Sequence, residues 1–139
     1  MAEGLFRKMT EQRETFIVGS AGISAVDGFM PTAETVRAMQ SEGVDVTGHR
    51  SRRLTLELIR RADRILVMET MHKEAVLRLC PEVSGKIFLL SEFSPDPVKM
   101  PRHTDIPDPI RMSDTFYARV LAMIRDCLEG FLKSFQENE

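Results

Sequence analysis

The chain has 139 residues, a formal net charge of -2, 42% hydrophobic residues and 29% charged residues. These values suit one ordinary folded domain over residues 1–139 and exclude a disordered chain. The charge and a pI near 6.0 give no broad cationic surface, so we expect neither a nucleic-acid nor a membrane partner. No membrane-spanning apolar run and no secretory-signal pattern occur, which favours a cytoplasmic protein.

The two cysteines, Cys80 and Cys127, are too few for a disulfide framework. Neither lies in a Cys-x-x-Cys motif or has a Cys/His spacing typical of a metal site. We therefore expect two buried thiols, and we expect neither a metal nor a cofactor.

In the first part of the chain, helical and extended patterns alternate. Helices are predicted over residues 2–13, 31–41 and 55–62, and a strand over 16–23. The predicted strand is apolar and partly β-branched, and it ends in a Ser-Ala-Gly turn signal. Pro31 and Thr32 open the second helix and Gly43 stops it, while Thr55 is a suitable N-cap for the third.

The second part predicts two more strands, two helices and a parallel sheet. Residues 64–68 and 87–90 are short continuous apolar runs, which are typical of strands covered on both faces. Thr70 caps a helix that runs to Leu79, and Ser113 caps a long final helix. The apolar stripe of that helix consists of Phe116, Val120, Ile124, Cys127, Phe131 and Phe135. This alternation predicts a doubly wound parallel sheet in a three-layer α/β/α arrangement.

A long loop over residues 94–112 follows the last predicted strand and holds five of the seven prolines. In such sheets the ligand site lies at the carboxyl ends of the strands. The loop carries Asp96, Asp105 and Asp108, so one interpretation is an acid–base aspartate that prolines hold in place. On the residues alone, a solvated surface loop is the favoured alternative.

Five segments, in order along nearly the whole chain, resemble the low-molecular-weight protein tyrosine phosphatases, which have a flavodoxin-like fold. They are Met-Ala-Glu-Gly-Leu-Phe-Arg-Lys at 1–8, Gly-Ser-Ala-Gly at 19–22, the Gly-x-Asp-x-x-x-His-x-Ser turn at 43–51, the strand-to-helix segment at 67–73, and Asp-Ile-Pro-Asp-Pro at 105–109. The segment at 67–73 is most similar to bacterial members, which include protein-arginine phosphatases.

The resemblance implies roles for four residues. Asp108 corresponds to the general acid that protonates the leaving oxygen and then activates water. Ser20 and His49 correspond to a serine and a histidine that brace an asparagine of the phosphate loop. On the residues alone, His49 is more simply a structural histidine and Ser20 a turn residue. Ile110 stands at the substrate rim.

The family's nucleophile has no counterpart among these residues. Family members open with an apolar strand that runs into a Cys-x5-Arg phosphate loop, which is followed by Ser-Pro and then the Met-Ala-Glu found here at the start of the chain. Cys80 precedes Pro81 and is followed six positions later by Lys86 instead of arginine, and Cys127 lies within the predicted final helix. We therefore expect an N-terminally truncated phosphatase domain that is inactive as given.

The substrate stays open among phosphotyrosine proteins, phosphoarginine proteins and small phosphomonoesters. Tyrosine-directed members usually place aromatic residues after the Asp-Pro pair, whereas Ile110 and Arg111 follow it here. This difference weakens a phosphotyrosine assignment.

The missing strand would lie inside the family's sheet, with a neighbour on each side. Its loss would leave roughly five unpaired backbone groups on each neighbour, at about 1 to 3 kcal/mol for each buried one. Because a domain is stable by only about 5 to 15 kcal/mol, we expect that the remaining strands close the gap, that another chain fills it, or that the natural protein is longer. A homo-oligomer or strand-swapped dimer is expected, and the alternative function is that of a non-catalytic module acting in self-association or partner binding.

Overall fold

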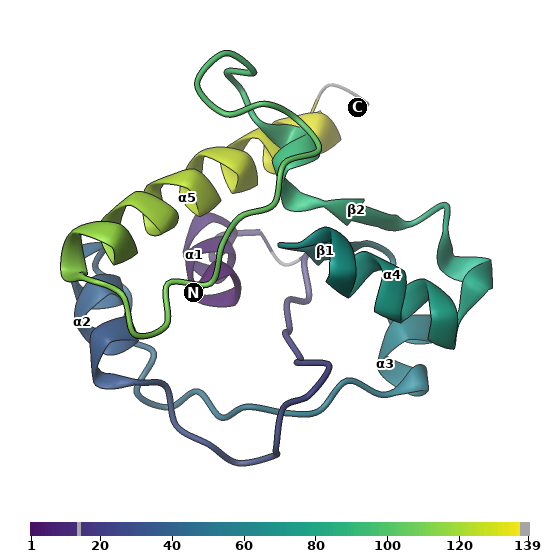
Figure 1. Cartoon of the computed structure of the whole chain (residues 1–139), viewed down its shortest axis with the longest axis horizontal. Coiled ribbons are helices and arrows are strands. Elements are labelled where there is room, and N and C mark those ends of the chain that lie inside the picture. Colours follow the sequence, from purple (N-terminus) through teal and green to yellow (C-terminus); the bar gives the residue numbers. More distant parts are fainter. Residues whose placement is uncertain (14, 137–139) are drawn as a thin grey trace.

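The structure, a computed structural model, describes residues 1–13 and 15–136 (Figure 1). Its helices are α1 (Ala2–Met9), α2 (Ala33–Ser41), α3 (Leu56–Arg61), α4 (Thr70–Leu79) and α5 (Asp114–Gln136). Its strands are β1 (Ile65–Val67) and β2 (Ile87–Leu89), and short 3-10 turns η1 (Pro81–Val83) and η2 (Leu90–Phe93) flank β2. None of the helices described is both long and apolar enough to cross a bilayer.

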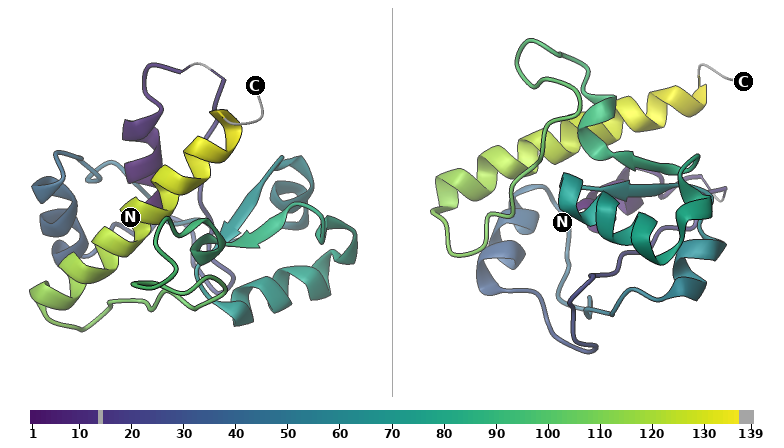
Figure 2. Two further views of the ribbon diagram at one scale, coloured as in Figure 1. Left: turned by 90° about the horizontal axis from the view of Figure 1, so that it is seen from above. Right: turned by 45° about the vertical axis from the view of Figure 1, so that its right-hand side comes forward.

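The two strands are parallel and form the middle layer of the molecule. Ile65 pairs with Ile87, and Val67 with Leu89. Side chains of β1 alternate between two apolar clusters, with Leu66 in the cluster of α1, α2 and α5 and with Ile65 and Val67 in the cluster of α3 and α4. Helices therefore cover both faces of a parallel sheet (Figure 2), which confirms the predicted flavodoxin-like α/β class.

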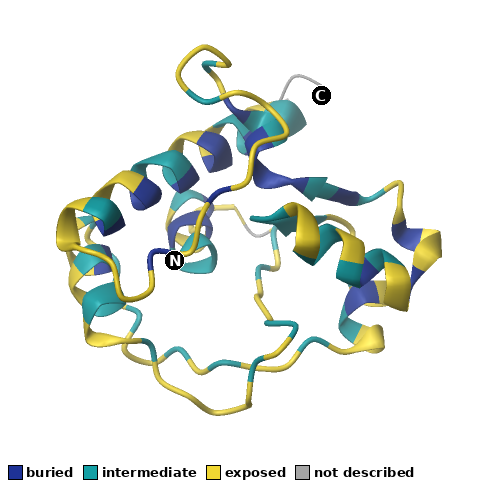
Figure 3. Cartoon of the chain, viewed as in Figure 1, coloured by how far each residue is buried: buried dark blue, intermediate teal, exposed yellow. Residues whose placement is uncertain are grey.

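The larger core cluster is built on α5, and Figure 3 shows its buried face turned toward the interior. Val120, Ile124, Cys127 and Phe131 are each at most 5% exposed. The Phe131 ring lies 5.6 Å from that of Phe6 in α1. The predicted apolar stripe of the final helix is thus confirmed.

Side chains begin several helices where the sequence predicts. Thr32 accepts a hydrogen bond from the Thr35 amide, and Thr55 accepts one from the Leu58 amide, both at 3.2 Å. Ser113 accepts one from the Phe116 amide at 3.2 Å. Gly43 has a φ of +72°, a left-handed conformation that suits glycine after a helix.

The strand predicted over 16–23 is wrong. Among the described residues this stretch forms only an isolated bridge between Gly22 and Arg53. Phe16 and Val18 pack against the larger core cluster while Ile17 is fully exposed, so the side chains alternate as they would in a strand. A strand also needs a hydrogen-bonded neighbour, and the sheet of the described chain contains only β1 and β2.

Other predicted elements need smaller corrections. The first helix ends at Met9 instead of near residue 13, and the strands are shorter by one or two residues than the runs 64–68 and 87–90. β1 is half-buried and not fully covered, because a neighbour pairs with it on one side only. Thr70 is the first residue of α4 and not its cap, since Glu69 occupies the N-cap position without a side-chain bond.

Candidate active site

The loop over residues 94–112 holds Asp108 at an exposed position, with Pro107 and Pro109 on either side. The Asp108 carboxylate accepts a hydrogen bond from the Ile110 amide at 3.1 Å, which closes a tight turn. Arg111, just beyond this turn, has a φ of +63°. The local sequence therefore presents the carboxylate on a stiff, sharply folded segment.

The loop is attached to the sheet layer three residues before Asp108. Asp105 accepts two hydrogen bonds of 2.8 Å through one carboxylate oxygen, from the backbone amide and from the hydroxyl of Thr70. Ile106 is 1% exposed and donates its amide to the Met68 carbonyl at 2.8 Å. The two bonds from Thr70 lower the pKa of Asp105, and His72 contributes in the same direction.

Asp108 lies near enough to the amino end of α1 for its charge to act on the Met1 amino group, and in Figure 1 the N-terminus is drawn over the loop. Burial lowers the pKa of the Met1 amino group, while the negative charges of Glu3 and Asp108 raise it. Unpaired amides and the helix dipole favour an anion at such a helix end. The arrangement therefore brings a potential proton donor next to a position that suits a phosphate.

His49 and Ser20 lie beside the same helix, but their contacts are with residues that the sequence did not single out. The His49 Nδ1 atom lies 3.0 Å from a carboxylate oxygen of Glu3. The Ser20 carbonyl accepts a 2.9 Å hydrogen bond from Arg52, and Arg7 donates to the nearby Val18 carbonyl at 2.6 Å. Glu3 thus links α1 to the turn that carries His49.

Ile110 is 53% exposed beside Asp108, so its side chain is available at the edge of the candidate site. The other loop aspartate, Asp96, closes a turn of its own by accepting the Val98 amide at 3.0 Å. The three candidate aspartates therefore differ in their partners: Asp96 and Asp108 each close a local turn, whereas Asp105 anchors the loop to Thr70.

Neither cysteine lies in a phosphate-binding loop. Cys80 is 1% exposed at the carboxyl end of α4, and burial, followed by Glu82, raises the pKa of its thiol. Cys127 is fully buried in α5, and burial raises the pKa of its thiol to about 11. Within residues 1–13 and 15–136, no group of three or more His, Cys, Asp or Glu side chains is arranged to hold a metal.

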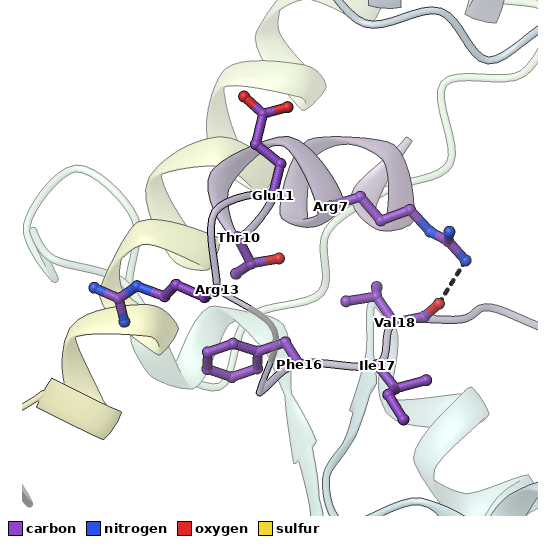
Figure 4. A pocket seen from close by; sticks show the side chains of 7 residues that line it. All are labelled: Arg7, Thr10, Glu11, Arg13, Phe16, Ile17 and Val18. Carbon is purple, nitrogen blue, oxygen red and sulfur yellow. Dashed lines mark hydrogen bonds between the residues drawn. The ribbon is translucent and has the colours of Figure 1, made fainter.

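A shallow pocket of about 370 Å³ lies away from this site, at the carboxyl end of α1 (Figure 4). It is lined by Arg7, Thr10, Glu11, Arg13, Phe16, Ile17 and Val18. None of the four predicted site residues lines it, so we place the candidate active site by its chemistry, at the opposite end of α1.

Sequence signals for the anchor were weak. Asp105 stands out only as one of several acidic residues in a proline-rich loop, and its partner Thr70 lies 35 residues earlier. Glu3 resembles any acidic residue in the first turn of a helix. The contact of Asp105 with Thr70 and that of Glu3 with His49 both depend on tertiary structure, which a single sequence does not reveal.

The sequence matches the family model of the low molecular weight phosphotyrosine protein phosphatases over residues 1–139. A relative, the probable low molecular weight protein-tyrosine-phosphatase EpsP of Ralstonia nicotianae, is 35% identical over 113 residues, which cover 81% of this chain and 72% of that protein.

Two solved structures share the fold. Vibrio vulnificus Wzb in complex with benzylphosphonate has a TM-score of 0.82 and 30% identity, over 96% of this chain and 87% of that one. A YwlE arginine phosphatase mutant with a phosphorylated active-site serine has a TM-score of 0.87 and 27% identity, over 99% of this chain and 88% of that one.

Proposed function

Since this chain belongs to the low molecular weight phosphotyrosine protein phosphatase family, we propose that its site serves phosphate-monoester hydrolysis with Asp108 as the acid–base residue. The observation that carries this proposal is the placement of an exposed, turn-held carboxylate beside the amino end of α1. The substrate class is a phosphorylated protein or a small phosphomonoester. Both cysteines are free and buried, which suits the reducing cytoplasm proposed as the protein's location.

In the proposed reaction, a thiolate of the family's Cys-x5-Arg loop attacks phosphorus and the bond to the leaving oxygen breaks. Protonated Asp108 gives its proton to that oxygen. The Asp108 carboxylate then takes a proton from water as the water oxygen attacks the cysteinyl phosphate, which releases phosphate and restores the thiolate. Ser20 and His49 support the phosphate loop in this proposal, and Ile110 contacts the substrate's leaving group.

We propose that residues 1–139 do not complete this reaction by themselves. The thiols of Cys80 and Cys127 are buried and their pKa values are raised. Cys127 lies inside α5, and Cys80 precedes only the three-residue 3-10 turn η1, whose first residue, Pro81, has no amide hydrogen to donate to a phosphate. A thiolate of lowered pKa is the form that attacks phosphorus. The nucleophile must therefore come from residues other than these two.

A two-part assay with p-nitrophenyl phosphate tests the proposal. The chain of 139 residues should show no turnover above buffer. The same chain extended before Met1 by an apolar strand and a Cys-x5-Arg-Ser-Pro loop of the family should turn over the ester. In that extended protein, Asp108→Asn should lower kcat by roughly 10²- to 10⁴-fold with a smaller change in KM.

Asp96→Asn is the matched control, because Asp96 is a loop aspartate that closes its own turn and should leave kcat unchanged. An extended Asp108→Asn protein with undiminished kcat would refute the acid–base role. Turnover by the unextended chain that disappears in Cys80→Ser or Cys127→Ser would refute the assignment of the nucleophile.

A second candidate function is self-association without catalysis, and the free edge of the sheet supports it. β1 pairs with β2 on one side, and the extended stretch that contains Ile17 pairs with neither strand of the described chain. A second copy of the chain could add a strand along such edges. Light scattering should then show a dimer or larger species that Ile17→Lys weakens, whereas a monodisperse monomer would contradict this function.

A further inference from the structure

We propose that Asp105 is a positioning residue that attaches the Asp108 loop to the amino end of α4. The inference rests on the proposed role of Asp108 and deepens it, because it assigns the group that fixes where the proton donor stands. Asp105 itself does not touch the reacting atoms in this proposal.

The first argument is the unusual capping of α4. The N-cap residue, Glu69, makes no side-chain capping bond, so the first amide of the helix needs another acceptor. Asp105 supplies it from 35 residues downstream and also accepts the Thr70 hydroxyl, at 2.8 Å in both cases. A carboxylate at this end of a helix is favoured by the helix dipole as well. The contact joins the start of α4 to a loop that Ile106 also ties to the end of β1, through its buried side chain and its bond to the Met68 carbonyl.

The second argument is the short, stiff path from this contact to Asp108. Ile106, next to Asp105, is buried and bonded through its amide to the Met68 carbonyl at the end of β1. Pro107 and Pro109 then fix the backbone φ on either side of Asp108, and Pro109 is buried. Few soft torsions remain between the anchor and the Asp108 carboxylate. A shift at Asp105 should therefore move Asp108.

The third argument separates the duties of the two aspartates. Asp105 is bonded as an ionised acceptor to two donors, and His72 adds to the favourable electrostatics around it. A carboxylate held in this state is a good anchor and a poor proton donor at neutral pH. Asp108 accepts the neighbouring Ile110 amide in its own turn and is exposed, so its carboxylate faces solvent and does not brace another element.

Nuclear magnetic resonance of the chain of 139 residues tests the anchor without any catalytic assay. Two amides report on the loop. For Ile106 the measured quantity is the rate of amide hydrogen exchange, and for Ile110 it is the change in amide chemical shift with pH as the bonded Asp108 carboxylate is protonated. In Asp105→Ala we expect Ile106 to exchange at least about tenfold faster and the titration shift of Ile110 to fall to roughly half or less. Asp105→Asn keeps an oxygen acceptor and should restore most of both signals.

Thr70 provides matched variants on the other side of the contact. Thr70→Ser keeps both donors and should behave as the wild type. Thr70→Val loses the hydroxyl, so it should speed exchange at Ile106 and reduce the titration shift of Ile110, as Asp105→Ala does. If Asp105→Ala is too unstable to study, Thr70→Val tests the inference through the same Ile106 exchange rate and Ile110 titration shift. Exchange at Val120 in α5 serves as the measure of global stability.

The inference is overturned if, in Asp105→Ala, the exchange rate of Ile106 and the titration shift of Ile110 equal those of the wild type while the Thr70 amide alone exchanges faster. Asp105 would then cap α4 without positioning the loop. The inference is also overturned if Thr70→Val leaves both signals unchanged. Failure of the proposed function looks different, because an extended Asp108→Asn enzyme with full kcat would leave these resonance results as they are.

Discussion

Cys127 shows how the surroundings of one residue decide its chemistry. It lies in the middle of α5 with none of its surface exposed, and its pKa of about 11 leaves roughly one thiol in ten thousand ionised at pH 7. Cys80 is almost as buried. Nucleophilic cysteines occupy the opposite environment, which is partly exposed and electropositive.

We therefore predict that native protein at pH 7 resists alkylation by iodoacetamide at both Cys80 and Cys127. Intact mass measured over an hour should show little addition, while protein unfolded in urea should take up two groups. Rapid labelling of either thiol in the native protein would contradict the burial on which this prediction rests.

A second residue-scale prediction concerns acid stability and Asp105. Its pKa is lower in the folded protein than the ordinary value of 3.8, so the unfolded state binds the proton more readily. The stabilisation from this carboxylate is therefore complete above pH 3.8 and is lost as the pH falls through the lower, folded value. Urea midpoints of the wild type and Asp105→Asn should differ at pH 6 and converge toward pH 2.5. A difference that stays constant over this range would contradict the prediction.

The local turn at Asp108 could be predicted because its prolines are adjacent to it, whereas the acid–base role proposed for Asp108 came from the resemblance to the phosphatase family. Contacts between distant segments could not be predicted from the sequence. The contact of His49 with Glu3 spans α1 and a distant turn, and that of Asp105 with Thr70 joins a loop to a helix start. Neither pair has a spacing that periodicity or capping rules can detect.

At the scale of elements, local signals were sufficient for helices and insufficient for one strand. Ser113 and the apolar stripe predicted α5, and the helix begins and packs accordingly. The stretch 16–23 has the composition of a strand, but a strand also needs hydrogen-bonded neighbours. Beyond the isolated bridge of Gly22 with Arg53, the described chain pairs this stretch with no strand. Composition could therefore predict the extended shape of this segment but not its pairing.

Gly130 provides an element-scale prediction about how α5 packs on η2. In a helix interior, glycine to alanine usually stabilises by about 1 kcal/mol. Here a Cβ atom on Gly130 would lie 2.0 Å from the Phe93 carbonyl oxygen, so the two elements must separate. We expect Gly130→Ala to lower the free energy of unfolding by about 1 to 3 kcal/mol.

Urea denaturation measures the effect of Gly130→Ala, and Glu129→Ala is its control. Glu129 is the preceding residue of the same helix and is exposed, so its substitution should change stability by no more than about 0.5 kcal/mol. An alanine at position 130 that stabilises the protein would mean that α5 and η2 do not approach as closely as described.

At the scale of the whole molecule, the two apolar clusters lie on opposite faces of the sheet, and a peripheral arc connects α1, α2 and α3 (Figure 1). Residues 22–29 and 51–54 of the arc hold each other by backbone bonds, such as Gly28 to the Ser51 carbonyl at 2.8 Å. Residues 17–21 differ, because none of their amides donates to a backbone or side-chain acceptor among the described residues.

Amide hydrogen-exchange rates should therefore differ between residues 17–21 and the interior of α5. We predict that amides of residues 17–21 exchange within about seconds in dilute protein, whereas interior amides of α5 stay protected for at least minutes. If a second copy adds a strand at this edge, raising the protein concentration should slow exchange at 17–21 and leave the α5 amides unchanged. Strong protection at 17–21 that is the same at every concentration would contradict both the open edge and its use in self-association. In that case the amides of this segment would be bonded within a single chain.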